Sequence, residues 1–284
     1  MTTEIPRDFH FTDHDFQRIR KLIYDHAGIA LSDAKRDLVY SRLARRLRAN
    51  SINIFSQYLS FLAGNTQEWE AFVNSLTTNL TSFFRENHHF PLLAEHIKRV
   101  MHRKPLQLWC AAASTGEEAY SMAMTMVDLF GSFKPPVHIF ATDIDTNVLR
   151  KAESGIYGED RIEKLPAETI DRFFRRDNGG NEKVVTVRQE LRDMITFRQL
   201  NLLDNSWSAQ GPFEAIFCRN VMIYFDKPTQ YSILKKFIPA MRQDSLLFAG
   251  HSESFYHAGD LFKLRGKTVY EIANASRHLA QPGK

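Results

Sequence analysis

The stretch Leu106-Gln-Leu-Trp-Cys-Ala-Ala-Ala-Ser-Thr-Gly-Glu-Glu118 decides the fold of this 284-residue chain. An apolar run of strand length ends in a turn of small residues, and the turn leads into a helical pattern from Glu117 to Leu129. A second unit of the same kind follows, in which Val137-His-Ile-Phe-Ala-Thr-Asp143 precedes an expected helix from Thr146 to Ala152. Strands that alternate with helices predict a mostly parallel, doubly wound sheet of the α/β class.

The alternation continues toward the end of the chain. The further expected elements are the strands Ile195–Gln199, Ala215–Cys218 and Leu246–Ala249 and the helix Pro228–Met241. Thr268–Ile272 alternates like a final strand at the end of the sheet, for which an antiparallel direction is considered. One segment, about 155–194, interrupts this order. It holds the turn pattern Asn178-Gly-Gly-Asn181 and the strand pattern Val184-Val-Thr-Val187, which together indicate an inserted β-rich subdomain.

The first 78 residues carry helical periodicity and no strand pattern. We expect helices at Asp13–Ala27, from Ser32 or Asp33 to Ala49, at Ile54–Leu62 and at Gln67–Leu80. The sequence therefore predicts an all-helical domain over residues 1–78 and a sheet domain over residues 79–284.

Composition sets the broad class. Hydrophobic residues make up 43% and charged residues 25% of the chain, as in a soluble globular protein. No uncharged apolar run approaches the ~20 residues that span a bilayer, and residues 1–11 lack an apolar signal core, so a cytoplasmic protein is expected. Cys110 and Cys218 lie within strand patterns and are predicted to be core residues, with a catalytic cysteine as the alternative.

Candidate binding residues follow the expected strands. In an open parallel sheet, ligands bind beyond the carboxyl ends of the strands. Glu117 and Glu118 follow the first strand, where a single glycine, Gly116, does not make a dinucleotide fingerprint and the acidic pair favours a neutral or cationic ligand. Asp143 ends the second strand and is the candidate to hold ribose hydroxyls. For Glu117 and Glu118, the alternative role is charge complementarity at the start of a helix. For the segment after the second strand, the alternative is capping of the next helix by Asp145 or Thr146.

Two further segments are dense in polar and aromatic residues. Phe217-Cys-Arg-Asn-Val-Met-Ile-Tyr-Phe-Asp226 places arginine, asparagine and tyrosine after a central strand, although Tyr224 and Phe225 are equally compatible with packing on the sheet. Asn79-Leu-Thr-Ser-Phe-Phe-Arg-Glu86 precedes the sheet domain and has the composition of an ordinary polar loop.

Together these segments resemble the CheR family of chemotaxis receptor methyltransferases over nearly the whole chain. The resemblance rests on Asn79–Glu86, Ala112-Ala-Ser-Thr-Gly-Glu-Glu118, Ala141-Thr-Asp-Ile-Asp145, Asn201-Leu-Leu203, Phe217–Asp226 and Phe248-Ala-Gly-His-Ser-Glu-Ser254. It implies a Rossmann-like methyltransferase domain with a small antiparallel β insertion behind an N-terminal helical domain, which agrees with the pattern analysis.

The resemblance also implies the chemistry. The cofactor is S-adenosylmethionine, the product S-adenosylhomocysteine, and the substrate the glutamate γ-carboxylate in the cytoplasmic domain of methyl-accepting chemotaxis receptors. The positions that match the family's cofactor contacts are Asn79, Thr81, Arg85, Glu118, Asp143, Asn201, Leu202, Arg219 and Asn220. Arg85 and Tyr224 match residues near the transferable methyl and are expected to be catalytic. Neither a metal, nor nucleic acid, nor direct membrane insertion is expected.

The helix that ends near Ala49 is strongly basic. Its Arg42, Arg45 and Arg46 lie on overlapping faces and are predicted to dock the glutamate-rich receptor helices. The alternatives are a merely solvated helix face, or docking by the β insertion around Val184–Val187.

Three other functions are compatible with parts of the sequence pattern. A nicotinamide-dependent dehydrogenase is disfavoured by the glycine pattern, and a nucleic-acid-binding protein would have to rely on the basic helix alone. A nucleic-acid methyltransferase would use Cys218 to attack a pyrimidine, but Cys218 stands within a strand pattern with no preceding proline.

Overall fold

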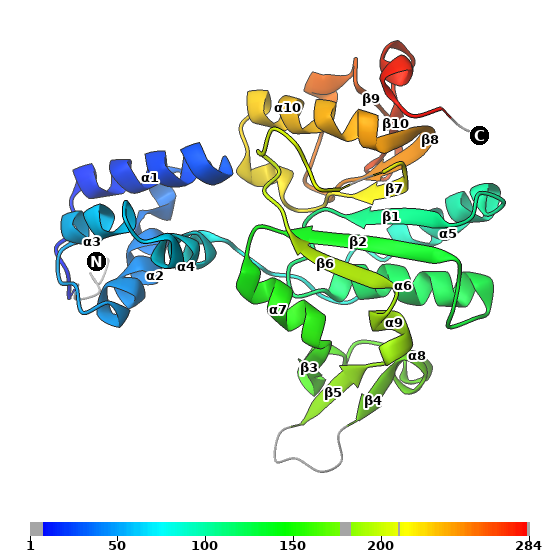
Figure 1. The fold of residues 1–284 in the computed structure, drawn as a ribbon, viewed down its shortest axis with the longest axis horizontal. Helices are drawn as coiled ribbons and strands as arrows, with labels where there is room; N and C mark the ends of the chain where they lie inside the picture. The colour runs from blue at the N-terminus through cyan, green and yellow to red at the C-terminus, as the bar shows by residue number, and fades with distance from the viewer. Residues whose placement is uncertain (1–7, 177–182, 210, 283–284) are drawn as a thin grey trace, which may run out of the picture. The chain divides into compact units, whose positions relative to one another are not determined.

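The computed structural model describes residues 8–176, 183–209 and 211–282. The chain forms two compact units (Figure 1). One contains the residues up to Thr78 together with Tyr224–Asp226, and the other contains Asn79–Ile223 and the chain from Lys227 onward. The expected turn at Asn178–Asn181 lies outside the described residues.

The first unit is helical. It contains α1 (Asp13–Ala27), the 3₁₀ turn Asp33–Lys35, α2 (Arg36–Ala49), α3 (Phe55–Leu62) and α4 (Thr66–Leu76). Thr12 and Asp15 form a reciprocal capping box at the start of α1, and Gly28 ends the helix in the left-handed conformation, with φ of 67°. Its core consists of fully or nearly fully buried apolar side chains, among them Phe16, Ile19, Leu43, Leu47, Phe55 and Phe72.

Two helix boundaries differ from the sequence-based expectation. The last helix ends at Leu76 rather than Leu80, because Thr77 is extended, with ψ of 155°. The chain after Thr77 has no apolar periodicity to bury, and its polar residues follow the irregular backbone described below. At the start of α2, the first turn is 3₁₀, and Ser32 makes no side-chain capping bond within the described chain.

The second unit is built on a seven-stranded sheet in the order β6-β2-β1-β7-β8-β10-β9. The strands are β1 (Leu106–Cys110), β2 (Val137–Asp143), β6 (Ile195–Gln199), β7 (Phe213–Phe217), β8 (Met241–Phe248), β9 (Phe262–Gly266) and β10 (Val269–Ile272). The first five strands across the sheet are parallel, whereas β10 pairs antiparallel with both of its neighbours, β8 and β9. The expected doubly wound, mostly parallel sheet is confirmed, and the last strand is antiparallel.

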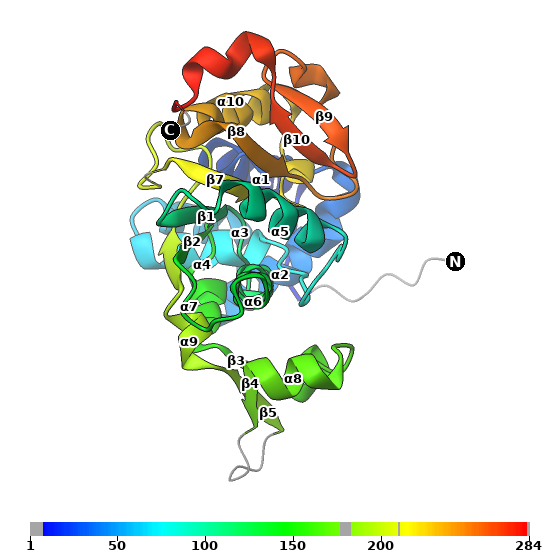
Figure 2. The same ribbon diagram turned by 90° about the vertical axis from the view of Figure 1, so that its right-hand side faces the viewer.

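Helices cover both faces of this sheet. On one face, α5 (His89–Val100) and α6 (Glu117–Phe130) lie side by side, as both views show (Figures 1 and 2), and share a core with alternate residues of β1. Trp109 points to the opposite face, where its ring lies 5.3 Å from that of Phe237 in α10 (Lys227–Phe237). The sequence analysis did not predict α5, and it extended α10 to Met241, which instead begins β8.

The insertion forms a small sheet of its own. Strands β3 (Ile156–Gly158), β5 (Val184–Val187) and β4 (Phe174–Arg176) pair antiparallel in that order, and α8 (Ala167–Phe173) and α9 (Gln189–Arg192) accompany them. It lies next to α7 (Thr146–Ser154), below the large sheet in Figure 1. This confirms the small antiparallel β insertion.

Within the described ranges, every helix is too short or too polar to cross a lipid bilayer.

Candidate active site

The order of the strands places a switch point between β1 and β7. From β1 the chain proceeds to β2 and β6 on one side, and then continues with β7 and β8 on the other. Loops at such a point diverge and leave a crevice at the carboxyl ends of the strands. Asp143 is the last residue of β2, and Glu118, Arg219 and Asn220 belong to the segments that follow β1 or β7, as expected from the sequence.

Asp143 is held by the backbone around it. The Ser114 amide donates to Oδ2 at 2.8 Å and the Asp145 amide donates to Oδ1 at 3.0 Å. Burial raises the pKa of Asp143 to about 6, against the lowering effect of these amide bonds. The Ile144 amide is a further donor to this carboxylate, which still keeps acceptor capacity for a hydroxyl donor.

Asn79 lies beside this carboxylate. Its Nδ2 donates to Asp145 at 2.8 Å, and its carbonyl accepts from the Ser114 hydroxyl at 3.0 Å. Asp145 also caps α7 by accepting from the amides of Asn147 and Val148, so the capping alternative holds for Asp145 and leaves Asp143 available. Thus the loops after Leu76, β1 and β2 meet at one place.

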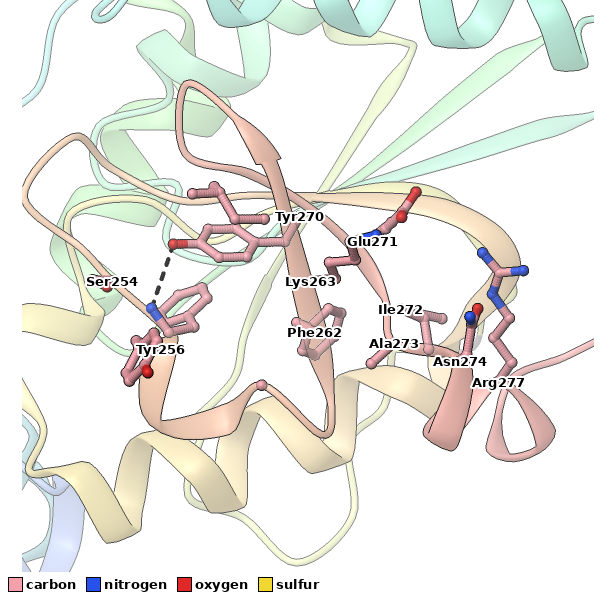
Figure 3. Close-up of a pocket in the computed structure, with 13 residues that line it drawn as sticks. Ser254, Tyr256, Phe262, Lys263, Tyr270, Glu271, Ile272, Ala273, Asn274 and Arg277 are labelled. Atoms are coloured by element: carbon pink, nitrogen blue, oxygen red, sulfur yellow. Dashed lines mark hydrogen bonds between the residues drawn. The ribbon is translucent and has the colours of Figure 1, made fainter.

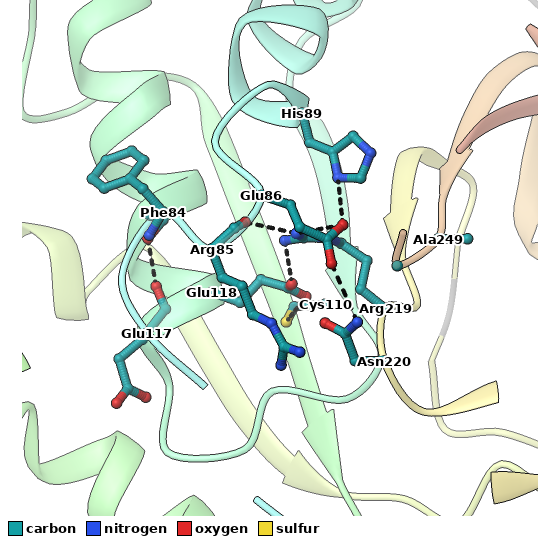
Figure 4. Close-up of polar contacts among 12 residues, drawn as sticks. Phe84, Arg85, Glu86, His89, Cys110, Glu117, Glu118, Arg219, Asn220 and Ala249 are labelled. Carbon is teal, nitrogen blue, oxygen red and sulfur yellow. Dashed lines mark hydrogen bonds and ion pairs between the residues drawn. The ribbon is translucent and has the colours of Figure 1, made fainter. Parts of the chain in front are cut away.

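A second polar cluster centres on Arg219, which is 4% exposed (Figure 4). Its Nη1 donates to Glu118 at 2.8 Å, and its Nη2 donates to the Arg85 carbonyl at 2.6 Å and lies 3.2 Å from Glu86 Oε2. Burial raises the pKa of Glu118, against the charge of Arg219. One buried guanidinium therefore stands between two carboxylates.

Glu86 links this cluster to the loop after β8. Asn220 Nδ2 donates to its Oε1 at 3.2 Å, the His251 amide donates to Oε2 at 3.1 Å, and His251 Nδ1 lies 2.9 Å from Oε1. Burial alone would raise the pKa of Glu86, but the bonds from His251, the charge of Arg219 and the Asn220 amide outweigh it and lower the pKa to about 2.

The segment Asn79–Glu86 wraps around the start of α6. The Phe84 amide donates to the Ser121 hydroxyl at 2.9 Å, and the half-buried Arg85 folds back so that its Nη1 donates to the Leu80 carbonyl at 2.8 Å. Phe84 and Glu86 adopt left-handed backbone angles, with φ of 50° and 52°. Such angles cost free energy for non-glycine residues and are frequent where a local shape is functionally required.

The β insertion braces the same loops. Arg161 donates to the Thr81 carbonyl at 2.8 Å and pairs with the fully buried Glu117. The Tyr157 hydroxyl donates to the Thr115 carbonyl at 2.6 Å. Gly116 has φ of 96°, and a Cβ there would lie 2.8 Å from that of Ala152, so only glycine fits this turn.

The remaining predicted cofactor residues follow β6. The amide of Leu200 bonds to the Asp143 carbonyl at 3.0 Å, which aligns this loop with the end of β2. Asn201 Oδ1 accepts from the Leu203 amide at 3.0 Å, and the carbonyl of the buried Leu202 accepts from Lys236 at 2.5 Å.

Tyr224 and the three arginines of α2 belong to the helical unit. The Tyr224 carbonyl accepts from the Ala30 amide at 2.9 Å, and its side chain is half-buried. Arg42 donates to the carbonyls of Leu76 and Thr77, so it caps the end of α4.

The other two docking candidates differ in exposure. Arg46 forms a two-pronged pair with the buried Glu68, at 3.0 and 2.6 Å, whereas Arg45 is exposed. Since Arg42 and Arg46 bind within the helical unit, Arg45 is the docking candidate whose guanidinium faces solvent.

Both cysteines are fully buried, as expected for core residues. Burial raises the pKa of each thiol, and the Cys110 thiol donates to Glu118 at 3.2 Å. A raised pKa keeps a thiol protonated and weakens it as a nucleophile, which disfavours the catalytic-cysteine alternative.

A cavity of about 560 Å³ lies elsewhere in this unit, between the β9–β10 hairpin and the 3₁₀ turn Tyr256–Ala258 (Figure 3). Aromatic side chains such as Phe262 and Tyr270 line it, together with Lys263 and Arg277 at its rim. It contains none of the residues predicted to bind cofactor or substrate.

Sequence analysis missed several residues of the site. Glu86, His251 and Glu253 stand in quoted motifs but received no role, because a polar run before a helix does not reveal which of its charges will be buried. Arg161 and Glu117 are 44 positions apart, and no periodic pattern connects them.

Comparison with known proteins shows to which family the chain belongs. Residues 79–271 match the model of the CheR methyltransferase, SAM binding domain, and residues 14–77 match that of the CheR methyltransferase, all-alpha domain. The chain is 52% identical to chemotaxis protein methyltransferase 2 of Pseudomonas aeruginosa, over 94% of this chain and 96% of the relative. It is 53% identical to the chemotaxis protein methyltransferase of Escherichia coli, over 92% of each chain.

The residues present fit the cofactor that these matches specify. S-adenosylmethionine carries ribose hydroxyls, which suit a carboxylate with spare acceptor capacity, and a sulfonium cation, which suits a site that contains acidic side chains such as Glu86 and Glu118. These matches identify a methyltransferase and exclude the dehydrogenase alternative. The chain belongs to the CheR methyltransferase family and is an S-adenosylmethionine-dependent methyltransferase of chemotaxis.

Proposed function

We propose that the protein methylates glutamate side chains in the cytoplasmic domains of methyl-accepting chemotaxis receptors, and that it does so in the cytoplasm. The product is a glutamyl methyl ester. The observation that carries the proposal is the convergence of Asp143, Glu118 and Arg219 at the switch point of a methyltransferase sheet in a chain whose relatives are chemotaxis methyltransferases.

The chemistry asks little of the protein beyond positioning. A glutamate side chain has a pKa of about 4.3 and is an anion at neutral pH. One of its oxygens attacks the sulfonium methyl carbon, the C–S bond breaks with its electron pair left on sulfur, and neutral S-adenosylhomocysteine departs. Because no proton moves, the site needs no general base. Its task is to align oxygen, carbon and sulfur and to exclude water.

The cofactor contacts are proposed residue by residue. Asp143 binds the ribose hydroxyls, and the loops that meet around it contribute Asn79, Thr81, Asn201 and Leu202. Glu118, Arg219 and Asn220 form the rest of the cofactor site, on the side of β1 and β7 where Arg85 also lies.

Arg85 and Tyr224 are proposed to orient the reacting carboxylate. Arg85 is half-buried and its guanidinium bonds to a neutral carbonyl, so it is able to meet an anion. Its attraction has to be moderate, because tight pairing with the ground-state carboxylate would lower the nucleophilicity of the attacking oxygen. A hydroxyl donor such as Tyr224 orients the same carboxylate with less neutralisation.

Substrate docking is proposed for the outer face of α2. The predicted residues are Arg42, Arg45 and Arg46. Of these Arg45 is exposed, as are Leu38 earlier in α2 and Lys35 in the preceding 3₁₀ turn. Glutamate-rich receptor helices approach this face through opposite charge, which speeds encounter more than it adds affinity.

The test is transfer of labelled methyl groups from S-adenosylmethionine to isolated receptor cytoplasmic domains, with RNA offered in parallel. The proposal expects label on the receptor fragment and background label on RNA. Substituting the methylatable glutamates of the fragment by alanine is the matched control and should abolish the signal. Label on RNA, or label that persists on the alanine fragment, would refute the proposed substrate.

A further inference from the structure

Glu86 is a carboxylate of the site that bonds to side chains in both loops after the neighbouring strands β7 and β8. Its side chain is 10% exposed. Oε1 meets Asn220 Nδ2 at 3.2 Å and His251 Nδ1 at 2.9 Å, while Oε2 meets the His251 amide at 3.1 Å and Arg219 Nη2 at 3.2 Å. Each oxygen therefore faces two donors, which uses the capacity of a carboxylate.

The loop after β7 is held in a second way, through its backbone. The buried Glu253 accepts from the amides of Asn220 and Met222, at 3.0 and 2.7 Å, and from the amide of Gly250. Asn220 has φ of 58°, and a Cβ on Gly250 would lie 2.3 Å from its Nδ2. The two loops are thus in close contact, and Glu253 fixes their main chains.

The two glutamates bond to different parts of the loop after β7. Glu253 bonds to amides, which set the path of the chain, whereas Glu86 bonds to the side chains of Arg219 and Asn220, which set where those groups point. Without Glu86, Arg219 would keep the Arg85 carbonyl at Nη2 and the Glu118 carboxylate at Nη1, but it would lose the charged partner at Nη2. Bonds between ionised groups are about twice as strong as bonds to neutral acceptors, so Glu86 strengthens the hold on this end of the guanidinium.

We propose that Glu86 is a positioning residue for cofactor binding, which orients the side chains of Arg219 and Asn220 while Glu253 holds the backbone beneath them. The proposal rests on the cofactor roles proposed above for Arg219 and Asn220. Glu86 itself does not need to touch the cofactor, because its carboxylate is already occupied by four donors.

The primary test is S-adenosylmethionine binding, measured by calorimetry. Glu86→Gln keeps the shape of the side chain but turns an NH₂ group toward existing donors. It should raise the Kd for S-adenosylmethionine about 10–100-fold, which is the usual effect of losing a bond to a charged group or a supporting partner. Glu95→Gln is the matched control, since Glu95 in α5 is 65% exposed and should leave the Kd unchanged.

A double-mutant cycle separates positioning from a purely structural role. Asn220→Gly removes the side chain and suits the positive φ at that position. If Glu86 acts through Asn220 and Arg219, part of the Glu86→Gln effect on the Kd disappears in the Asn220→Gly background. An unchanged Kd in folded Glu86→Gln, or full additivity of the two substitutions, would overturn the proposal.

A milder variant keeps the test available if Glu86→Gln does not fold. The His251 ring is 67% exposed, so His251→Ala removes one bond to Glu86 with little loss of packing. It should raise the Kd about 2–10-fold, and no rise would count against the proposal. Since all these readouts use cofactor binding alone, they are independent of whether the receptor is the substrate.

Discussion

At the residue scale, the site combines carboxylates whose environments differ. Burial raises the pKa of Asp143 to about 6, while Arg219 and His251 outweigh burial and lower the pKa of Glu86 to about 2. At neutral pH both are ionised, but only Asp143 titrates near physiological pH. This difference follows from their partners: backbone amides at Asp143, and a guanidinium at Glu86.

Replacing Asp143 by alanine should weaken S-adenosylmethionine binding by about 1.5–3 kcal/mol, because hydrogen bonds from the ribose to a charged group are lost. Calorimetry on the folded variant measures this directly. An affinity equal to that of the parent protein would rule out the ribose role and leave Asp143 as a loop-forming residue.

Cofactor affinity should also depend on pH. Hydroxyl donors favour the ionised form of Asp143, so binding prefers the deprotonated protein. The affinity is therefore expected to be constant above about pH 6 and to fall as the pH drops below the raised pKa. The variant Asp143→Asn does not titrate at this position, and its pH profile should be flat over the same range. An equal decline in both proteins would assign the effect to another group.

Arg85→Ala should reduce the rate of methyl transfer far more than it reduces thermal stability. The Arg85 side chain is half-buried and its guanidinium bonds to one carbonyl, so its removal leaves no buried charge unpaired. The measurement compares receptor turnover with the melting temperature. Normal turnover in the variant would make Arg85 a structural residue.

At the element scale, the sequence predicted the parallel strands well because each is a short apolar run followed by a helix. The stretch Leu106–Glu118 contains the strand, the small-residue turn and the helix start of this unit, and all three are present. It did not predict α5, since His88, His89 and Pro91 hide its helical pattern. Nor did it predict where α4 ends, since the polar residues after Leu76 still suit a helix by composition.

The insertion is joined to the cofactor loops by a pair of charges that sequence patterns cannot reveal. Arg161→Ala leaves the fully buried Glu117 without its cationic partner and should cost about 3 kcal/mol of unfolding free energy, as for other broken buried pairs. Arg172→Ala is the matched control, because Arg172 and Asp128 are 40% and 54% exposed and such pairs contribute less than about 1 kcal/mol. Equal urea denaturation curves for the two variants would contradict the claim that the Arg161–Glu117 pair stabilises the fold.

The basic helix α2 gives a prediction about docking. Reversal of the exposed charge in Arg45→Glu should lower receptor methylation and flatten its decline with ionic strength, while S-adenosylmethionine binding stays unchanged. Lys21→Glu in α1 is the control with the same change of charge. If both variants methylate receptor alike, α2 is not the docking surface, and the β insertion becomes the better candidate. Arg46 is unsuitable for this test, because its reversal would also break the pair with Glu68.

At the scale of the whole molecule, fold class and family were predictable, whereas the site's internal contacts were not. Strand periodicity and motif order required only local sequence. The Arg219 cluster joins residues from positions 86, 118, 219 and 251, and its bonds depend on the tertiary fold. The polar loop Asn79–Glu86 had no signal of its own beyond the family resemblance, yet it connects both halves of the site.

The central claim is that this chain forms methyl esters on receptor glutamates, and the chemical nature of the transferred group tests it most directly. Receptor cytoplasmic domains are methylated with labelled S-adenosylmethionine, purified and treated with mild base. The account predicts that the label is released as volatile methanol, because esters hydrolyse in base, and that peptides from the unhydrolysed fragment carry it on glutamate. Label that withstands base, as an N-methyl group would, or that maps to another residue type, would contradict the account.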